Sequence, residues 1–297
     1  MRTLKISSLL FGLTVLISTV SSFAQSVKVK LLTANETGTY HKMGQDLKSA
    51  LLPEIDIELI PSLGSLTNVL TIAVNPDIHL GFAQIDVLNS PLIKDKVQLA
   101  LPLYEEEVHL LATKSIKHLA DLYTKKVSLG VNGSGTFSAA TALLKALEID
   151  NIEKVYLEIE DSLTALAQGD IDALFYVIGY PAPLLEKQVT VNDKLHLVPV
   201  KGKFDNTFSP TVIPPQTYPW QQQAIETVSV LSVLASHAYH SDDPRCEAVG
   251  QVINAIYKKM DVLKKKGHDK WDKVKFDPQV LAEDKTISAC TLKSFSE

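Results

Sequence analysis

Val127–Thr136, with the sequence VSLGVNGSGT, predicts a short strand, a glycine-rich turn and the start of a helix. A shorter version of this pattern lies earlier, at Val29–Tyr40, where Thr37-Gly38-Thr39 takes the place of Ser134-Gly135-Thr136. The two central glycines lie 97 positions apart. An Asp-Ile pair follows each unit, and these pairs lie 93 positions apart. The chain therefore predicts two similar α/β units, and hence two lobes with a cleft between them.

Each glycine-rich turn leads into a segment with helical spacing of its apolar residues. A helix N-terminus offers N–H groups without an intrahelical acceptor and carries partial positive charge. Two such termini facing one cleft would bind a small anion. Neither turn is a nucleotide-binding loop, because Ser138 stands where a third glycine is needed and no Gly-Lys-Ser/Thr follows. We therefore expect no cofactor.

Strands alternate with helical segments along most of the chain, which favours mostly parallel sheets with helices on both faces. Residues 97–103 and 108–113 are expected to be two separate strands. The chain would leave the first lobe near Thr113 and return near Thr211, and closure about these crossings is a known switching mode. The expected parts are a leader at 1–24, lobe I at 25–112 and 212–297, and lobe II at 113–211.

The first 24 residues have a basic start, an uncharged run from Ile6 to Val20 and a small-x-small site that ends at Ala24. This pattern predicts a secretory signal peptide cleaved near Ala24, with a retained anchor helix as the alternative. Cleavage would remove two positive charges and change the formal net charge from −5 to −7. An acidic chain without a broad basic face does not suit a nucleic-acid partner. We expect a periplasmic monomer.

The chain has two cysteines, Cys246 and Cys290, which an oxidising compartment would allow to pair, although their spacing does not show that they meet. Outside the leader it has one arginine, Arg245, beside 26 lysines. Arg245 lies in an Asp-Asp-Pro-Arg turn that we expect at the surface. Anion binding would then rest on backbone N–H groups, hydroxyls, amides or lysine rather than on a guanidinium fork.

Further polar residues begin predicted helices or follow predicted strands, at the edge where open α/β sheets bind ligands. They are Gly64, Ser65 and Asn68 at a helix start, Gln84 and Asp86 after a strand, and the turn from Gly133 to Thr136. Simple helix capping or an ordinary loop is the alternative for each. Phe175 and Tyr176 end the matching strand of the second unit, where an aromatic side chain would line a pocket or belong to the core.

Two charged segments invite other interpretations. Glu105–Glu107 with His109 suggests a metal site, but alternate residues of a strand point to opposite faces, so we expect no metal. Lys258–Lys275 holds eight lysines interrupted by aspartates. A solvated helical face is expected there, with docking to a membrane partner as the alternative.

In their order and spacing the motifs resemble the TAXI-type solute receptors of tripartite ATP-independent periplasmic (TRAP) transporters. The matching residues are Gly38-Thr39-Tyr40 with Gly44, Gly64-Ser65 with Asn68, Gln84 with Asp86, Gly133-Ser134-Gly135-Thr136, Asp170-Ile171-Asp172-Ala173, Gly179-Tyr180-Pro181, and Ile213-Pro214 with Tyr218. The resemblance runs from about residue 28 to about residue 235.

The resemblance implies a two-lobe periplasmic binding protein of type II, with two mostly parallel sheets joined by two hinge strands. It also implies a small carboxylate ligand, such as glutamate or 2-oxoglutarate, and a TRAP membrane permease that imports it with an ion gradient. The predicted ligand-binding residues are Gly38, Thr39, Tyr40, Gly64, Ser65, Asn68, Gln84, Asp86, Gly133, Ser134, Gly135, Thr136, Gly179 and Tyr218.

The chain departs from the family pattern at three places. Asn35-Glu36 replaces small residues, His41 replaces a common second tyrosine, and Thr67 replaces a frequent acid. If Glu36 faced the cleft it would repel a simple dicarboxylate, or it could meet the ammonium group of an amino acid.

Two other function classes stay open from the sequence. One is a hydrolase or transferase on the same two-lobe scaffold, since a fold does not determine a function. A histidine or carboxylate with a shifted pKa in the cleft would favour that class. The other is a secreted immunogenic or adhesive protein, which a ligand-indifferent cleft would favour.

Overall fold

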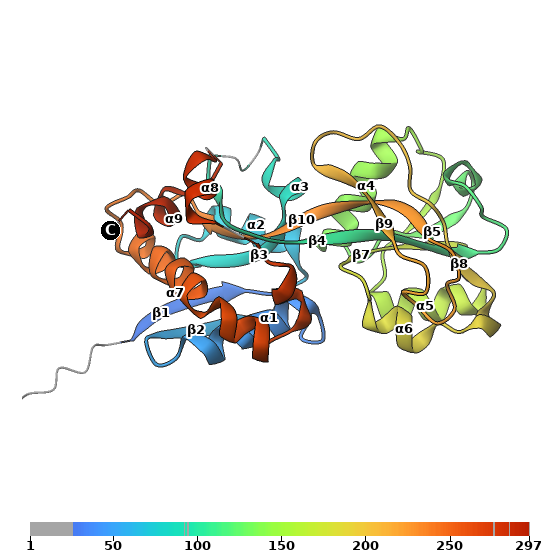
Figure 1. Ribbon diagram of the computed structural model, residues 1–297. Coiled ribbons are helices and arrows are strands. Elements are labelled where there is room, and N and C mark those ends of the chain that lie inside the picture. The colour runs from blue at the N-terminus through green and yellow to red at the C-terminus, as the bar shows by residue number, and fades with distance from the viewer. Residues whose placement is uncertain (1–25, 92, 94, 276, 285, 297) are drawn as a thin grey trace, which may run out of the picture.

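The computed structural model describes residues 26–296 apart from 92, 94, 276 and 285, so the predicted signal peptide lies outside the described residues. Two lobes are joined by two long antiparallel strands, β4 (Val97–Thr113) and β10 (Ile225–His237), which run through both lobes (Figure 1). Paired strands follow one path in the order β2-β1-β3-β10-β4-β7-β5-β6, with β8 on β4 and β9 on β10. The predicted two-lobe α/β fold with two hinge strands is confirmed. The predicted two mostly parallel sheets are instead one connected sheet of mixed pairing, because both hinge strands pair antiparallel with their neighbours.

Lobe I is built from the N-terminal part of the chain and the C-terminal tail. Its elements are β1 (Val27–Leu32), α1 (Thr39–Leu51), β2 (Ile55–Ile60), α2 (Ser65–Val74), β3 (Leu80–Gln84), α3 (Ile85–Leu88), α7 (Pro244–Lys266), the 3-10 turn η3 (Asp269–Lys273), α8 (Pro278–Glu283) and α9 (Ala289–Ser294). Strand β1 pairs in parallel with both β2 and β3, and β3 pairs antiparallel with β10. Helix α1 buries Met43, Leu47 and Leu51 because their four-residue spacing places them on one face.

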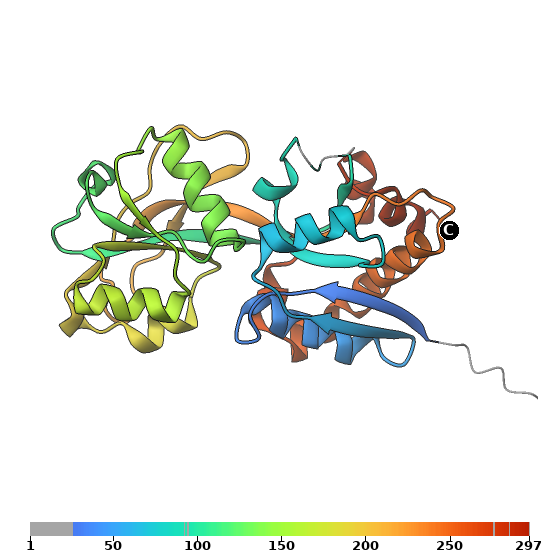
Figure 2. The same cartoon turned by 180° about the vertical axis from the view of Figure 1, so that it is seen from behind.

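Lobe II is built from the middle of the chain. Its elements are η1 (Leu119–Leu122), β5 (Lys126–Ser128), α4 (Gly135–Ala146), β6 (Glu153–Val155), α5 (Ile159–Gln168), β7 (Ala173–Ile178), α6 (Pro183–Gln188), η2 (Val191–Asp193), β8 (Leu195–Leu197) and β9 (Phe208–Ile213). Strand β5 pairs in parallel with β6 and β7, and β7 pairs antiparallel with β4. In lobe I, helices α1 and α2 follow the parallel strands β1 and β2. In lobe II, helices α4 and α5 follow the parallel strands β5 and β6 (Figure 2).

The crossings between the lobes differ from the expected boundaries at 113 and 211. Leu103 and Tyr104 pack in the core of lobe I and Val108 packs in a core of lobe II, so the first crossing falls at Glu105–Glu107. The expected strands 97–103 and 108–113 are one continuous strand, β4, because β10 pairs with the three acids and the residues before them, and β7 pairs with Glu107 and the residues after it. The acids interrupt the apolar pattern without interrupting the backbone ladder.

The return crossing lies about twenty residues later than expected. Ile213, Tyr218 and Trp220 pack in a core of lobe II, and β10 packs against the core of lobe I from Leu231 onward. The register between β10 and β4 shifts between Leu231 and Val233, which is an irregularity in the ladder at the crossing. Residues 212–230 thus belong with lobe II, because β9 and the first half of β10 form an antiparallel pair there.

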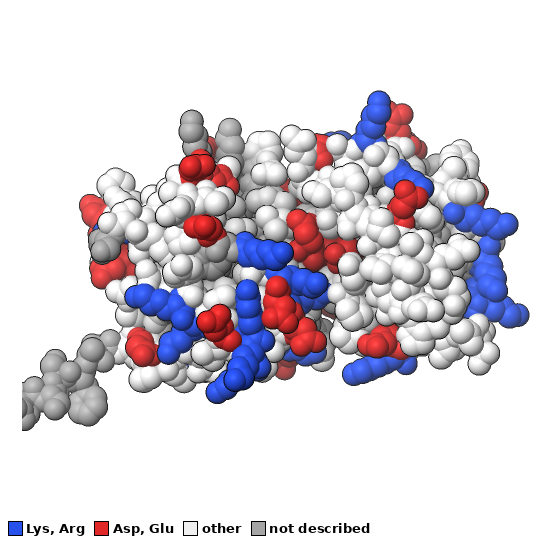
Figure 3. All heavy atoms as spheres, in the orientation of Figure 1, with Lys and Arg blue, Asp and Glu red and all other residues white. Residues whose placement is uncertain are grey.

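A disulfide between Cys246 and Cys290 joins α7 to α9, two helices of the C-terminal tail of lobe I. Most lysines of the 258–275 segment are exposed, as expected for a solvated face, but Lys270 is buried. On the face drawn in Figure 3, acidic and basic side chains are interspersed. No helix in the described part of the chain has both the length and the apolar character needed to cross a membrane.

Candidate ligand-binding site

A cavity of about 340 Å³ is lined by residues from both lobes. Four helices, α1 and α2 of lobe I and α4 and α5 of lobe II, begin at its wall. The two repeated turns share this cavity, since Gly38 and Gly135 both line it. Strand β7 contributes Phe175 and Tyr176, and the hinge strand β4 contributes Glu106.

Nine of the predicted ligand-binding residues line the cavity. They are Gly38, Thr39, Tyr40, Gly64, Ser65, Gln84, Ser134, Gly135 and Thr136. The first backbone bond of α1 runs from the N–H of Lys42 to Gly38, and that of α4 from Ser138 to Ser134. The N–H groups that precede these bonds have no intrahelical acceptor, so both helix starts present free donors and partial positive charge.

Two hydroxyls of the second turn already have protein partners. The Ser134 Oγ accepts a hydrogen bond from the N–H of Phe137 at 3.1 Å, so this residue is the N-cap of α4. The Thr136 Oγ1 accepts from the N–H of Val177 at 3.1 Å, which ties the helix start to β7. Because a hydroxyl both accepts and donates, Thr136 can still donate its hydrogen into the cavity.

Asn68 and Asp86 were predicted at the site, but they do not line the cavity. The Asn68 side chain is fully buried, and its Nδ2 donates to the carbonyl oxygens of Thr33 and Phe82 at 2.5 and 2.7 Å. Its amide therefore satisfies backbone groups of lobe I and is not free for a ligand. Asp86 lies in the short helix α3, where burial raises the pKa of its carboxyl to about 6.

Gly133, Gly179 and Tyr218 also lie outside the residues that line the cavity. Gly179 packs beneath Lys270, because a Cβ at Gly179 would come within 2.6 Å of the Nζ atom. The Tyr218 hydroxyl donates to Nε2 of His109 at 2.8 Å and accepts from the N–H of Ala182 at 3.0 Å. These contacts secure the hinge region of lobe II, so the polar groups are used within the fold.

The residues at the three departures from the family pattern lie in different surroundings. Glu36 is exposed and does not line the cavity, whereas its neighbours Asn35 and Thr37 do. His41 is buried with its Nδ1 atom 3.2 Å from the Oγ1 of Thr33. Thr67 contacts the other lobe, since its N–H donates to the carbonyl oxygen of Gly133 at 3.0 Å.

Glu106, one of three acids that line the cavity with Glu158 and Glu160, is not among the predicted ligand-binding residues. It is 4% exposed, and its Oε2 accepts from the Tyr40 hydroxyl at 3.1 Å and from Nε2 of Gln84 at 2.6 Å. Its Oε1 accepts from the Tyr104 hydroxyl at 3.1 Å. The sequence signal for Glu106 is the run of three successive acids in a buried strand. Side chains alternate between the two faces of a strand, so at least one of the three acids must point to each face.

Glu105–Glu107 do not converge on a metal. Glu105 is exposed, Glu106 faces the cavity, and Glu107 accepts a hydrogen bond from the N–H of Tyr180 at 2.9 Å. Among the described residues, no group of three or more histidine, cysteine, aspartate or glutamate side chains is arranged to hold a metal ion.

Burial raises the pKa of Glu106 to about 7, against the lowering effect of the hydrogen bonds from Gln84, Tyr104 and Tyr40. Burial and the charge of Glu106 hold the pKa of Tyr40 well above its usual range. A carboxyl with this pKa gains or loses its proton near neutral pH, and the hydrogen-bond donors around it stabilise its ionised form.

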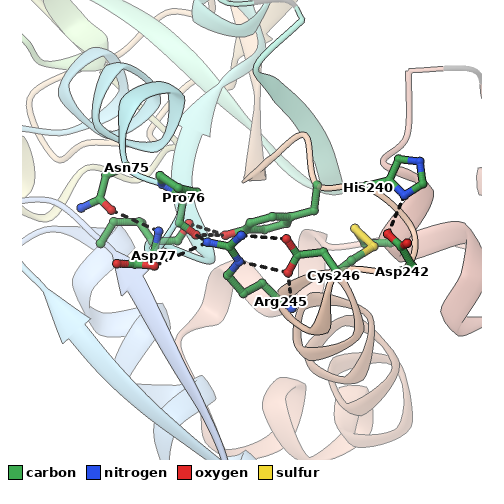
Figure 4. Close-up of polar contacts among 11 residues, drawn as sticks. Asn75, Pro76, Asp77, His240, Asp242, Arg245 and Cys246 are labelled. Atoms are coloured by element: carbon green, nitrogen blue, oxygen red, sulfur yellow. Dashed lines mark hydrogen bonds and ion pairs between the residues drawn. A yellow bond between two sulfur atoms is a disulfide. The ribbon is translucent and has the colours of Figure 1, made fainter.

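The charged groups of the cavity wall are Lys42, Lys187, Glu106, Glu158 and Glu160. Arg245 is engaged elsewhere, at the start of α7 (Figure 4). Its Nε and Nη2 donate to the two carboxylate oxygens of Asp243 at 3.0 and 2.7 Å. The cavity therefore combines helix N-termini with acidic and lysine side chains.

Several solved structures have a similar fold. YhfZ from Shigella flexneri is 15% identical with a TM-score of 0.51, covering 82% of this chain and 94% of that one. The effector-binding domain of QuiR in complex with shikimate is 12% identical with a TM-score of 0.50, covering 82% and 100%. The amino acid ABC transporter substrate-binding protein AbpA from Streptococcus pneumoniae, bound to L-arginine, is 16% identical with a TM-score of 0.48, covering 83% and 95%.

At these low identities the structural likeness bears on the fold alone, which is the two-lobe fold of type II periplasmic binding proteins. A family model gives the assignment by sequence. The NMT1-like family model matches residues 31–281, which include both repeated turns, both hinge strands and every residue that lines the cavity. The chain therefore belongs to the NMT1-like family.

Proposed function

We propose that the chain is a solute receptor that binds a small organic anion between its lobes. The observation that carries this proposal is the convergence of the N-termini of α1 and α4 on one cavity, with Gly38 and Gly135 on its wall. A hydrogen bond from such an N–H group to a carboxylate is charge-assisted and contributes about 1.5–3 kcal/mol. The cavity of about 340 Å³ suits a small metabolite.

In the proposed complex both lobes contact the ligand. Lobe II supplies the N–H groups of Gly135 and Thr136 and the Thr136 hydroxyl, while lobe I supplies Thr39, Ser65 and other groups at the starts of α1 and α2. A ligand held by both lobes stabilises their closed arrangement over an open one, because only the closed arrangement makes both sets of bonds.

The finer proposal is a periplasmic receptor of the TAXI type that delivers an amino acid or a dicarboxylate, such as glutamate or 2-oxoglutarate, to a TRAP permease. Its support is that the motifs behind the resemblance, Gly38-Thr39-Tyr40, Gly64-Ser65 and Ser134-Gly135-Thr136, line one cavity. The Cys246–Cys290 disulfide suits an oxidising compartment outside the cytoplasm.

Native mass spectrometry of the purified mature protein, followed by a thermal-shift screen of organic acids and amino acids, tests the receptor function. At about 100 times its dissociation constant a true ligand stabilises the folded state by about 2.7 kcal/mol. We expect at least one compound to produce a saturable shift. No bound mass and no shift across the panel would contradict the proposal and favour a protein without a small-molecule ligand.

One observation favours a second candidate, an enzyme on the same scaffold: Glu106 lies in the cavity with its pKa raised to about 7 by burial. Both of its carboxyl oxygens, however, already accept hydrogen bonds from Tyr40, Gln84 and Tyr104. Incubating the protein with its ligand and following the ligand mass separates the two functions. A receptor returns the ligand unchanged, whereas an enzyme converts it.

A further inference from the structure

Glu106 is a buried acid whose hydrogen-bond partners are all neutral. Tyr40, Gln84 and Tyr104 supply the three hydrogen bonds to its carboxylate. Among the ion pairs between described residues, none includes Glu106. Lys270 is influenced by the charge of Glu106, but its Nζ donates to the carbonyl oxygen of Tyr180 at 2.5 Å. An ionised carboxylate buried without a cation is costly, so a cationic group on a ligand would stabilise the ionised form of Glu106.

The bond to Glu106 determines the orientation of the neighbouring Gln84 amide. An ionised carboxylate only accepts hydrogen bonds, so the NH₂ group of Gln84 must face it and the Oε1 atom must face away. This Oε1 is buried and has no hydrogen-bond partner among the described residues, and the same holds for the Oγ of Ser65. Both atoms lie beside the start of α4, since a Cβ at Gly135 would come within 2.4 Å of the Gln84 Oε1 and within 2.7 Å of the Ser65 Oγ.

The cavity therefore presents two kinds of binding group close together. The starts of α1 and α4 offer N–H donors that require an acceptor, such as a carboxylate. Glu106 and the Oε1 of Gln84 are acceptors that require a donor, and Glu106 also favours a cation. A ligand that satisfies both sets carries a carboxylate and a protonated amine on the same carbon.

We infer that the ligand is an α-amino acid, and that Glu106 with Gln84 selects its ammonium group against the keto group of the matching 2-oxo acid. This inference rests on the proposed receptor function and narrows its ligand class. A keto oxygen is an acceptor, so it would face Glu106 and the Gln84 Oε1 without any hydrogen to share. The ammonium group supplies both hydrogen and charge to the two buried acceptors.

Matched ligand pairs test the inference, because their members differ only at the second carbon. The pairs are L-glutamate with 2-oxoglutarate, L-aspartate with oxaloacetate, L-alanine with pyruvate, L-leucine with 4-methyl-2-oxopentanoate, and L-phenylalanine with phenylpyruvate. Titration calorimetry on the mature protein gives a dissociation constant for each compound. We expect at least one amino acid to bind tenfold or more tightly than its oxo partner.

Glu106→Gln keeps the size of the side chain and removes its charge, so the preference for the amino acid should fall to threefold or less. The matched control is Glu105→Gln, which removes the same charge from the exposed neighbour on the same strand and should keep the preference. The ratio measured on the unmodified chain is decisive by itself if the Glu106 variant does not fold.

Two outcomes distinguish the inference from the receptor function. If the oxo acid of a binding pair binds as tightly as the amino acid or more tightly, the inference is overturned while the receptor function stands. If no member of any pair binds but another compound of the wider panel of organic acids does, the inference is again overturned alone. If no compound of that panel binds either, both are overturned.

Discussion

The N–H group and the hydroxyl of Thr67 both donate to the carbonyl oxygen of Gly133, at 3.0 and 3.3 Å, and thereby join lobe I to lobe II. Gly133 has a φ of +98°, a left-handed conformation that favours glycine. A Cβ added there would come within 2.5 Å of the Thr67 Oγ1. The close approach of the lobes at this point therefore depends on a residue without a side chain.

Gly133→Ala should hold the lobes apart and weaken ligand binding at least tenfold, about 1.4 kcal/mol. The matched control is Gly169→Ala, because Gly169 also has a positive φ, +82°, but its Cβ would meet nothing within 4 Å. Titration calorimetry and small-angle scattering with saturating ligand are the measurements. Wild-type affinity in Gly133→Ala would show that this contact does not control closure.

Thr136→Val should weaken binding at least several-fold, because it removes a hydroxyl at the cavity wall. It also leaves the N–H of Val177 without its acceptor, at a cost of about 1–3 kcal/mol in stability. Thr136→Ser keeps the hydroxyl and should stay near wild type in both respects. Thr141→Val, at an exposed position of the same helix, is the control for the added methyl. Unchanged affinity in Thr136→Val would count against the site.

The stability of the ligand-free protein should depend on pH through Glu106. Burial raises the pKa of this carboxyl from 4.5 to about 7, so the folded state holds its proton more tightly than the unfolded state does. Its contribution to the free energy of unfolding is therefore fully present below about pH 4.5 and is lost as the pH rises through about 7.

Glu106→Gln should remove this dependence and become more stable than wild type above pH 7, by at most about 3 kcal/mol. Asp86, whose pKa burial raises to about 6, titrates in both proteins and cancels in the difference. Glu107, whose pKa burial raises to about 7, also titrates in both, so that only its charge interaction with Glu106 enters the difference. Urea unfolding at pH 5 and pH 8 measures the difference in the free energy of unfolding between wild type and Glu106→Gln, with Glu105→Gln as the control. Equal pH dependence in wild type and Glu106→Gln would contradict the assignment.

Lys270 should stabilise the contact between the C-terminal tail and lobe II. Its Nζ donates to the carbonyl oxygen of Tyr180 and lies 5.9 Å from the ring centroid of Tyr104. Lys270→Met keeps the apolar stem but loses the hydrogen bond, so the free energy of unfolding should fall by about 1–3 kcal/mol. Lys273→Met, at an exposed position of the same turn, should have little effect. Similar losses in both variants would rule out a specific role for the Lys270 amine.

The features that could be predicted from the sequence are those set by neighbouring residues. The turns at Gly38 and Gly135 precede helices because glycine and hydroxyl residues favour a helix start, and both turns line the cavity. The strand β4 was divided in the prediction, because three acids at the crossing resemble a loop until its pairing with β10 is seen.

Local pattern and composition were enough to predict the two repeated units, their helix starts and the lack of a guanidinium for the anion. Which polar side chains remain free for a ligand depends on how distant parts of the chain pack together. Asn68 and Tyr218 are used by backbone and side-chain groups far away in sequence, whereas Glu106 faces the cavity from the hinge. That division depends on long-range strand pairing, which places each polar atom beside a protein partner or beside an open space.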